Sequence, residues 1–243
     1  MTPKTRIDRL LVERGLFDSR AKAQDAIAAR LVKANGKVVA KASEEVTADA
    51  VIEASPAHPY VSRGALKLIA ALDHFKFDPA GRVCLDIGAS TGGFSEVLLT
   101  RGAAHVTAVD VGTAQLHPSL RDDPRITSLE QSDIRNLDAA RLDPKPDLVV
   151  IDVSFISLKQ VLPAAFTLAA RPAQLIALIK PQFEAGREHL KKGIVRDDAV
   201  RQRVCDDIAA LVTSLGAGVL GVIPSPIEGG DGNVEYLIGA TIS

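Results

Sequence analysis

The stretch LDIGASTGGF, from Leu85 to Phe94, decides the fold of this chain. It continues an apolar run, RVCLDI, of the kind that forms a strand buried in a sheet. The strand ends at the acid Asp86, and the chain then turns through Gly88, Gly92 and Gly93. Such a turn in an α/β sheet lets the backbone approach a bound nucleotide closely. The spacing of the glycines therefore indicates which class of nucleotide or nucleoside ligand is bound.

The sequence does not match either of two glycine-rich turns that bind phosphate. The dinucleotide-binding turn is G-x-G-x-x-G, and counted from Gly88 its second glycine falls on Ser90. The phosphate loop G-x-x-x-x-G-K-[ST] matches Gly88, Gly93 and Ser95, but Phe94 stands where its phosphate-binding lysine belongs. Neither a dinucleotide nor a nucleoside triphosphate is favoured.

Acids around the turn favour S-adenosylmethionine, which carries no phosphate. Its cationic sulfonium and amino group suit carboxylates, and an acid such as Asp110 after the second strand can hold its ribose diol. A strand-end Asp can instead cap the next helix, and for any one of these acids that alternative stays open. We expect S-adenosylmethionine as the cofactor, with contacts from Asp86, Gly88, Ser90, Gly92, Gly93, Phe94, Asp110, Asp133 and Asp152.

Beyond residue 82 the chain alternates apolar strand candidates with helical patterns or loops. Residues 147–152 and 174–180 are almost continuously apolar, as strands buried on both faces of a parallel sheet are. The last connection, IPSPIEGGDGN, is too short and too rich in Pro and Gly for a crossover helix, so the final strand is predicted to be antiparallel. We therefore predict an α/β, Rossmann-like fold with a mostly parallel seven-stranded sheet. Its strand candidates are 82–87, 105–110, 126–130, 147–152, 174–180, 218–223 and 233–242.

The first 58 residues follow a different pattern. RIDRLLVERG and RAKAQDAIAARLV predict two helices, the first ending at Gly15 and the second beginning after Ser19. VKANGKVVA predicts a hairpin that turns at Asn35-Gly36, and residues 51–53 predict a further strand. We expect a small α+β domain with a proline-containing linker over residues 1–58, and a second domain over residues 59–243.

Composition excludes several classes of protein. Cys84 and Cys205 lie far apart in the sequence and predict neither a disulfide nor a metal site, which favours a reducing compartment. The N-terminus lacks the apolar core of a secretory signal, and no run approaches about 20 apolar residues. We expect a cytoplasmic protein without stable membrane insertion.

LDIGASTGGF, VVIDVSFISL, LIKPQFEAG and GNVEYL together resemble the FtsJ-type ribose 2′-O-methyltransferases. With VSRGALKL and the N-terminal pattern they resemble, more closely, the hemolysin A (TlyA) family of ribosomal RNA methyltransferases. SRAKAQDAI and VKANGKVV are similar to the S-four RNA-binding domain. The resemblance spans nearly the whole chain and implies methyl transfer from S-adenosylmethionine to a ribose 2′-hydroxyl, with ribosomal RNA or ribosomal subunits as the partner.

The resemblance also implies a catalytic Lys-Asp-Lys-Glu set, matched by Lys67, Asp152, Lys180 and Glu235. Asp152 and Lys180 end parallel strands and Glu235 begins an antiparallel one, so these three are expected at one sheet edge. Lys67 reaches that edge only if its helix crosses over it. A neutral lysine could take the proton of the hydroxyl, with the acids holding the ammonium groups. Two ordinary ion pairs are the alternative.

Basic residues supply the candidate RNA contacts. Between Lys4 and Lys41 there are ten Lys and Arg against four acids, which favours a phosphate-binding face over a merely solvated one. A second basic stretch, 186–203, could flank the target nucleotide or be an ordinary loop, and Phe155 and Phe183 could stack on a base or belong to the core. The candidates are Arg9, Arg20, Lys22, Arg30, Lys33, Lys37 and Arg63.

Other activities fit less well. Methyl transfer to a base amino group usually uses an Asn/Asp-Pro-Pro-aromatic loop, whereas Asp152 is followed by Val-Ser-Phe. Transfer to a pyrimidine carbon needs a cysteine at the sheet edge, where neither cysteine is expected. A membrane-active cytolysin and a non-catalytic RNA-binding assembly factor are the alternatives from other classes.

Overall fold

The computed structural model describes residues 4–243 and divides into two compact units, Met1–Arg63 and Gly64–Ser243. The division falls a few residues after the boundary expected at residue 58. Asp25 explains why the linker stays with the first unit: its carboxylate lies 3.7 Å from His58 Nε2 and 3.7 Å from Arg63 Nη1.

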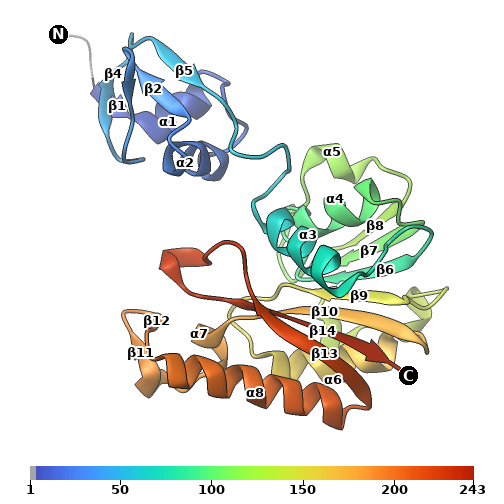
Figure 1. Cartoon of the computed structure of the whole chain (residues 1–243). Helices are drawn as coiled ribbons and strands as arrows, with labels where there is room; N and C mark the ends of the chain where they lie inside the picture. Colours follow the sequence, from blue (N-terminus) through green and yellow to red (C-terminus); the bar gives the residue numbers. More distant parts are fainter. Residues whose placement is uncertain (1–3) are drawn as a thin grey trace. The chain divides into compact units, whose positions relative to one another are not determined.

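The first unit holds two helices and two small sheets (Figure 1). Its core combines Ile7 and Leu11 of the first helix with Ala23 and Ile27 of the second and with Val32 of the hairpin. The strands that precede Ile7 and follow Glu44 were not expected from the sequence. The elements are β1 Lys4–Arg6, α1 Ile7–Glu13, α2 Arg20–Ala28, β2 Val32–Ala34, β3 Lys37–Val38, β4 Glu45–Thr47 and β5 Ile52–Ala54.

Helix α2 ends earlier than its sequence pattern predicts. Ser19 caps its start, accepting a hydrogen bond from the Lys22 N–H at 3.3 Å. At its end Arg30 adopts φ +62°, and the Leu31 N–H donates to the Ala26 carbonyl at 2.9 Å. This left-handed closure stops the helix at Ala28 and sends the chain into the hairpin, which turns through Asn35 and Gly36 as expected.

The second unit is built on one seven-stranded sheet, and the predicted fold class is confirmed. The strand order is β13-β14-β10-β9-β6-β7-β8. The last strand, β14, is antiparallel to both of its neighbours, while the remaining pairs are parallel. The strands are β6 Val83–Ile87, β7 His105–Val109, β8 Ile126–Leu129, β9 Leu148–Ile151, β10 Ala173–Ile179, β13 Ala217–Pro224 and β14 Tyr236–Ile242.

Helices cover both faces of this sheet (Figure 1). The longer α-helices are α3 Gly64–Phe75, α4 Gly93–Thr100, α6 Leu158–Leu168 and α8 Asp198–Ser214, and the short ones are α5 Pro118–Arg121 and α7 Pro181–Glu184. α3 and α4 pack on one face, and α6 and α8 on the other. Short 3-10 turns are η1 Ile134–Asn136, η2 Ala139–Arg141, η3 Arg187–His189 and η4 Gly230–Gly232, and a small hairpin is formed by β11 Leu190–Lys191 and β12 Ile194–Val195.

A close approach between α3 and β14 matters for function. A Cβ at Gly239 would lie 2.5 Å from the Phe75 ring, so only glycine lets the helix lie this close to the strand. Lys67 precedes Phe75 by about two helical turns, and Glu235 precedes Gly239 by four strand positions. The contact at Phe75 therefore aims Lys67 at the start of β14.

Candidate active site

A cavity of about 710 Å³ opens at the carboxyl ends of β6, β7 and β9. Four predicted cofactor residues besides Gly88 line it: Ser90, Asp110, Asp133 and Asp152. Ligands of open α/β sheets bind at this edge because the turns that follow parallel strands meet there.

The glycine turn is held in place by its neighbours. Gly88 has φ +83°, and a Cβ there would lie 2.4 Å from the Asp152 carbonyl oxygen, so glycine is required. Asp110 braces the next part of the turn, because its carboxylate accepts from the Ser90 N–H at 2.8 Å and from the Gly112 N–H at 2.7 Å. Two cavity-lining turns are thus fixed by one acid.

Asp86 lies inside the unit and does not line the cavity. Its Oδ2 accepts from Ser95 Oγ at 2.7 Å, while its Oδ1 has no hydrogen-bond partner within residues 4–243. Burial raises the pKa of Asp86 to about 7; the Ser95 hydrogen bond opposes the shift and the charge of Asp152 adds to it. A cationic donor such as S-adenosylmethionine fits an acid-rimmed cavity beside this buried carboxyl.

Three other expected cofactor residues also lie away from the cavity lining. Gly92, at φ +94°, is the N-cap residue of α4, and a Cβ there would lie 2.4 Å from a Leu120 methyl carbon. Gly93 is the first residue of α4, and Phe94 is buried in the core. These three positions shape the turn, and their direct contact with the cofactor stays a prediction.

Asp133 lines the cavity but already has a cationic partner. Its Oδ2 lies 2.6 Å from Arg135 Nη2, and the hydrogen bonds from Arg135 hold the pKa of Asp133 below its usual range. Arg135 also donates to Gln160 Oε1 at 3.1 Å. Any contact of Asp133 with an adenine amino group shares its carboxylate with Arg135.

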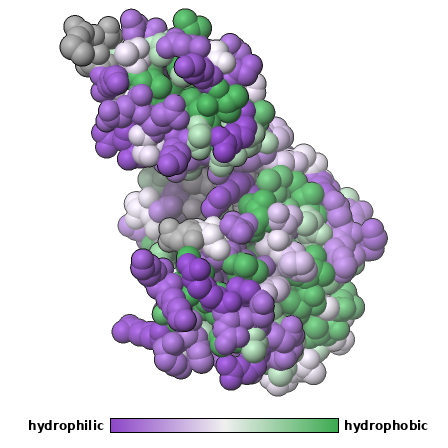
Figure 2. All heavy atoms as spheres, turned by 60° about the vertical axis from the view of Figure 1, so that its left-hand side comes forward, coloured by the Kyte–Doolittle hydropathy of each residue, from purple (hydrophilic) through white to green (hydrophobic). Residues whose placement is uncertain are grey.

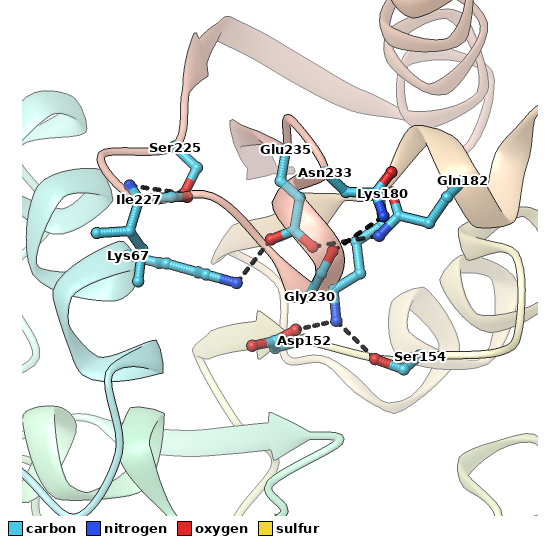
Figure 3. A network of polar contacts seen from close by, with 10 residues as sticks. All are labelled: Lys67, Asp152, Ser154, Lys180, Gln182, Ser225, Ile227, Gly230, Asn233 and Glu235. Carbon is cyan, nitrogen blue, oxygen red and sulfur yellow. Dashed lines mark hydrogen bonds and ion pairs between the residues drawn. The ribbon is translucent and has the colours of Figure 1, made fainter. Parts of the chain in front are cut away.

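Lys180, which is buried, and Asp152, which is half-buried, form one ion pair at the sheet edge (Figure 3). Lys180 Nζ lies 2.6 Å from Asp152 Oδ1 and 2.8 Å from Ser154 Oγ, and the Lys180 residue is only 8% exposed. Asp152 follows β9 and Lys180 follows β10, which is parallel to β9. Their meeting follows from the sheet topology.

Lys67 and Glu235 form a second buried pair (Figure 3). Lys67 Nζ lies 2.6 Å from Glu235 Oε2, and the two residues are 7% and 3% exposed. Gln182 Nε2 donates to the other Glu235 oxygen at 3.4 Å. A Cβ at Gly229 would lie 2.1 Å from Glu235 Oε1, so the loop before β14 needs glycine to leave room for the carboxylate.

The register of the sheet brings the two pairs to one edge. Ile179 pairs with Tyr236, so Lys180 and Glu235 leave adjacent antiparallel strands at the same end. A buried charge costs several kcal/mol unless it is paired, and each of the four charges has its partner. Sequence reasoning missed Ser154 and Gln182, although each lies two residues beyond a predicted catalytic residue.

The candidate RNA-contact residues of the first unit are mainly exposed. Several are paired with acids: Arg20 with Asp8 at 2.7 Å, Lys22 with Asp18 at 2.9 Å and Lys33 with Glu53 at 3.5 Å. Arg9, Arg30 and Lys37 are exposed. Hydrophilic side chains dominate the visible face of this unit (Figure 2).

The two cysteines are buried, with burial raising the pKa of Cys84 to about 12 and that of Cys205 to about 11. Neither thiol is poised as a nucleophile. Within residues 4–243 no helix is long and apolar enough to cross a membrane.

The parallel sheet with its reversed last strand is the fold of methyltransferases that use S-adenosylmethionine, and the acid-rimmed cavity suits that cofactor. The FtsJ-like methyltransferase family matches residues 60–241, and the S4 domain matches residues 5–52. The chain belongs to the TlyA family, which confirms the resemblance seen in its sequence motifs.

Individual relatives cover nearly the whole chain. The 16S/23S rRNA (cytidine-2′-O)-methyltransferase TlyA of Mycobacterium tuberculosis is 46% identical over 98% of this chain and 90% of its own length. Hemolysin A of Brachyspira hyodysenteriae is 38% identical over 96% of this chain and 98% of its own. A solved structure from Streptococcus thermophilus, described as a hemolysin, has a TM-score of 0.80, 40% identity and coverage of 100% of this chain and 90% of its own.

Proposed function

We propose that this enzyme transfers the methyl group of S-adenosylmethionine to the ribose 2′-hydroxyl of a cytidine in ribosomal RNA. The observation that carries the proposal is the ion pair between the buried Lys180 and Asp152, which lines the acid-rimmed cavity. The name of the Mycobacterium tuberculosis relative supports the choice of cytidine and of ribosomal RNA. A ribosomal substrate, free or within a subunit, implies action in the cytoplasm.

In this mechanism Lys180 is the general base or orients the hydroxyl. S-adenosylmethionine supplies an electrophilic methyl group on its sulfonium. Asp152 and Ser154 hold Lys180 Nζ at 2.6 and 2.8 Å, so the amine has a fixed position from which to take the proton once it is neutral. Lys67 and Glu235 support the site as a second pair. Much of the rate gain comes from position, because the acceptor oxygen is held for in-line attack.

The first unit would hold the RNA through phosphate contacts. The candidates Arg9, Arg20, Lys22, Arg30, Lys33, Lys37 and Arg63 all belong to it. Contacts of this kind carry little sequence information, and binding should weaken steeply as salt rises. Selection of the target nucleotide would then depend on contacts between that nucleotide and the active site of the second unit.

Phe155 is the residue best suited to hold a displaced base. It is 91% exposed, adopts φ +65° and lines the cavity. The centroid of its ring lies 5.2 Å from the centroid of the Phe183 ring. Exposure on this scale excludes the alternative that Phe155 belongs to the core. Unstacked RNA bases are commonly held on aromatic rings of this kind.

The test uses the full chain, ribosomal RNA and S-adenosylmethionine labelled on its methyl group. We expect label in RNA, and alkaline hydrolysis should leave the bond 3′ to the modified nucleotide uncut because a methylated 2′-oxygen cannot attack the adjacent phosphate. Label on a base with normal hydrolysis would refute the ribose assignment. RNA binding without label would favour an assembly factor, and leakage of dye from liposomes would favour a cytolysin, the reading suggested by the name of the Brachyspira relative.

A further inference from the structure

A basic hairpin follows the catalytic strand β10 and is not part of the catalytic network. We define it as residues 187–196, comprising η3, β11 and β12. Its exposed cations are Arg187, Lys191, Lys192 and Arg196. Its one acid, Glu188, lies 3.6 Å from His189. Four cations on ten residues leave the hairpin strongly positive on an enzyme whose net charge is −1.

Among the side chains that the structure describes, those of residues 4–230 and 232–243, these four cations have no ion-pair partner. Cations elsewhere in the same unit commonly have one: Lys159 pairs with Asp207 at 3.2 Å and Arg101 with Asp73 at 2.6 Å. Clustered like charges repel, and the cost is modest in water but persists unless an anion neutralises it. The hairpin is therefore suited to an anionic partner with several charges along its length.

The hairpin is fixed rather than loosely attached. Leu190 pairs with Val195 and Lys191 with Ile194 in an antiparallel ladder. The turn between them has φ +54° at Lys192 and φ +79° at Gly193, the conformation of a tight two-residue turn. A lysine in the left-handed region costs on the order of 1 kcal/mol relative to glycine. The fold therefore holds a charged side chain at the tip despite that cost.

Its tip is tied to the loop that carries Glu235. Asn233, which is buried, donates from Nδ2 to the Gly193 carbonyl at 3.3 Å and to the Gly230 carbonyl at 3.0 Å. At the base of the hairpin, Arg201 Nη1 donates to the Val195 carbonyl at 2.9 Å. Figure 1 shows β11 and β12 beside α7, the helix that begins directly after Lys180. The basic hairpin and the catalytic loop are thus joined at one edge of the sheet.

We propose that the basic hairpin binds the sugar-phosphate backbone of the RNA next to the target nucleotide, with Asn233 as the positioning residue for its tip. The partner is RNA because its phosphates repeat along a chain and because a site joined to the Glu235 loop meets the same strand as the active site. The inference rests on the proposed function. It adds a second RNA-binding element, belonging to the methyltransferase unit itself.

The test compares two double variants of the full chain that each remove two positive charges. Lys191→Gln/Lys192→Gln changes the hairpin, and Lys76→Gln/Lys145→Gln changes exposed lysines that precede β6 and β9, at the opposite edge of the sheet. We expect the hairpin variant to bind a ribosomal RNA fragment about tenfold more weakly at 150 mM salt. The slope of log K against log salt should fall by about 1.4, or about 0.7 for each lost phosphate contact.

Two further measurements make the outcome decisive. Lys191→Arg/Lys192→Arg should restore RNA affinity, and calorimetry should give all variants the same affinity for S-adenosylmethionine. Equal RNA affinity and salt slope in the hairpin and control variants would overturn the proposal. So would loss of binding to anionic vesicles of phosphatidylglycerol with RNA binding unchanged. Failure of the unaltered enzyme to methylate ribose would instead refute the proposed function, whatever the hairpin variants do in the binding assay.

Discussion

The two units of this enzyme pair their carboxylates with cations in different ways. In the first, the fully buried Asp8 accepts hydrogen bonds from Arg6, Arg20 and Gln24, at 3.0, 2.7 and 2.9 Å for the closest contact of each. In the second, Asp152 and Glu235 each meet one lysine. Two guanidinium groups on one carboxylate leave surplus positive charge, whereas the lysine pairs are balanced.

The choice of cation separates the two arrangements further. Arginine stays protonated in proteins, so the Asp8 cluster keeps its positive charge at any physiological pH. Lysine is a cation that can lose its proton in a suitable site. This contrast agrees with the proposed roles, RNA binding by the first unit and proton transfer in the second. Each prediction below tests one side of this contrast.

The largest effect is expected at Lys180. Lys180→Ala removes the proposed base, and we expect methyl transfer to fall at least about a hundredfold because a general base contributes about that much or more. Lys180→Arg should be similarly inactive, since a guanidinium keeps the charge but cannot take a proton. Single-turnover transfer assays measure both. Near-normal activity of the arginine variant would show that charge alone suffices.

A matched control for Lys180 is Lys159→Ala. Lys159 belongs to the same unit but forms an exposed pair with Asp207. Its loss should leave transfer unchanged, since exposed ion pairs contribute little. RNA affinity should be unaffected by Lys180→Ala, because the proposed RNA-binding residues belong to other parts of the chain.

The second pair should matter for stability. Lys67→Met leaves Glu235 buried and unpaired, and we expect a loss of about 3 kcal/mol in the free energy of unfolding. Lys67→Met combined with Glu235→Gln should be less destabilising than the sum of the single changes. Urea denaturation of the unaltered protein, the two single variants and the double variant measures the coupling free energy of the pair. The control is Asp73→Asn on the same helix, which breaks the exposed pair with Arg101 and should cost under about 1 kcal/mol. Additive single changes would contradict the coupling of the buried pair.

The meeting of Asp152, Lys180 and Glu235 at one sheet edge could be predicted from the sequence, but the approach of Lys67 to that edge could not. Lys180 and Asp152 follow apolar strands whose order fixes their meeting. Lys67 meets Glu235 because Phe75 packs against Gly239, a contact between residues far apart in the chain. The spacing of the glycine motif gave no information on which side chains turn inward, and the structure places both Phe94 and Asp86 in the interior. The pairing of Asp8 with Arg20 likewise depends on how two helices pack.

The two units should respond to pH in opposite directions. Burial raises the pKa of Asp86 to about 7, above its unfolded value of about 3.9. Asp86 therefore contributes stability that is present at low pH and lost as the pH rises towards 7. We expect the second unit to lose up to about 4 kcal/mol over this window. Asp86→Asn should remove the decline in denaturation curves recorded from pH 4 to 8, and a decline that persists in this variant would contradict the assignment.

Asp8 predicts the reverse for the first unit. Burial alone would raise the pKa of Asp8, but hydrogen bonds from Arg6, Arg20 and Gln24 outweigh it and hold that pKa well below the usual range. Its stabilising contribution is present above pH of about 4 and lost as the pH falls further. The protection factors of the Leu11 and Ile27 amides, in the core of this unit and corrected for the intrinsic exchange rate at each pH, should fall in acid, and Asp8→Asn should abolish that fall. Protection factors that stay constant in acid in the unaltered enzyme would remove Asp8 from this role.

The smallest effect concerns Glu130, a carboxylate that meets backbone amides instead of a cation. It accepts hydrogen bonds from the N–H groups of Ala114, Gln115 and Leu116, which fixes the loop after β7 that lines the cavity. Glu130→Gln weakens this set by about 1 kcal/mol, so the KM for S-adenosylmethionine should rise about fivefold with kcat unchanged. Asp122→Asn, at an exposed position nearby, is the control. If kcat fell while KM stayed constant, Glu130 would influence the reacting groups, and the separation between structural and proton-handling carboxylates would no longer hold in the second unit.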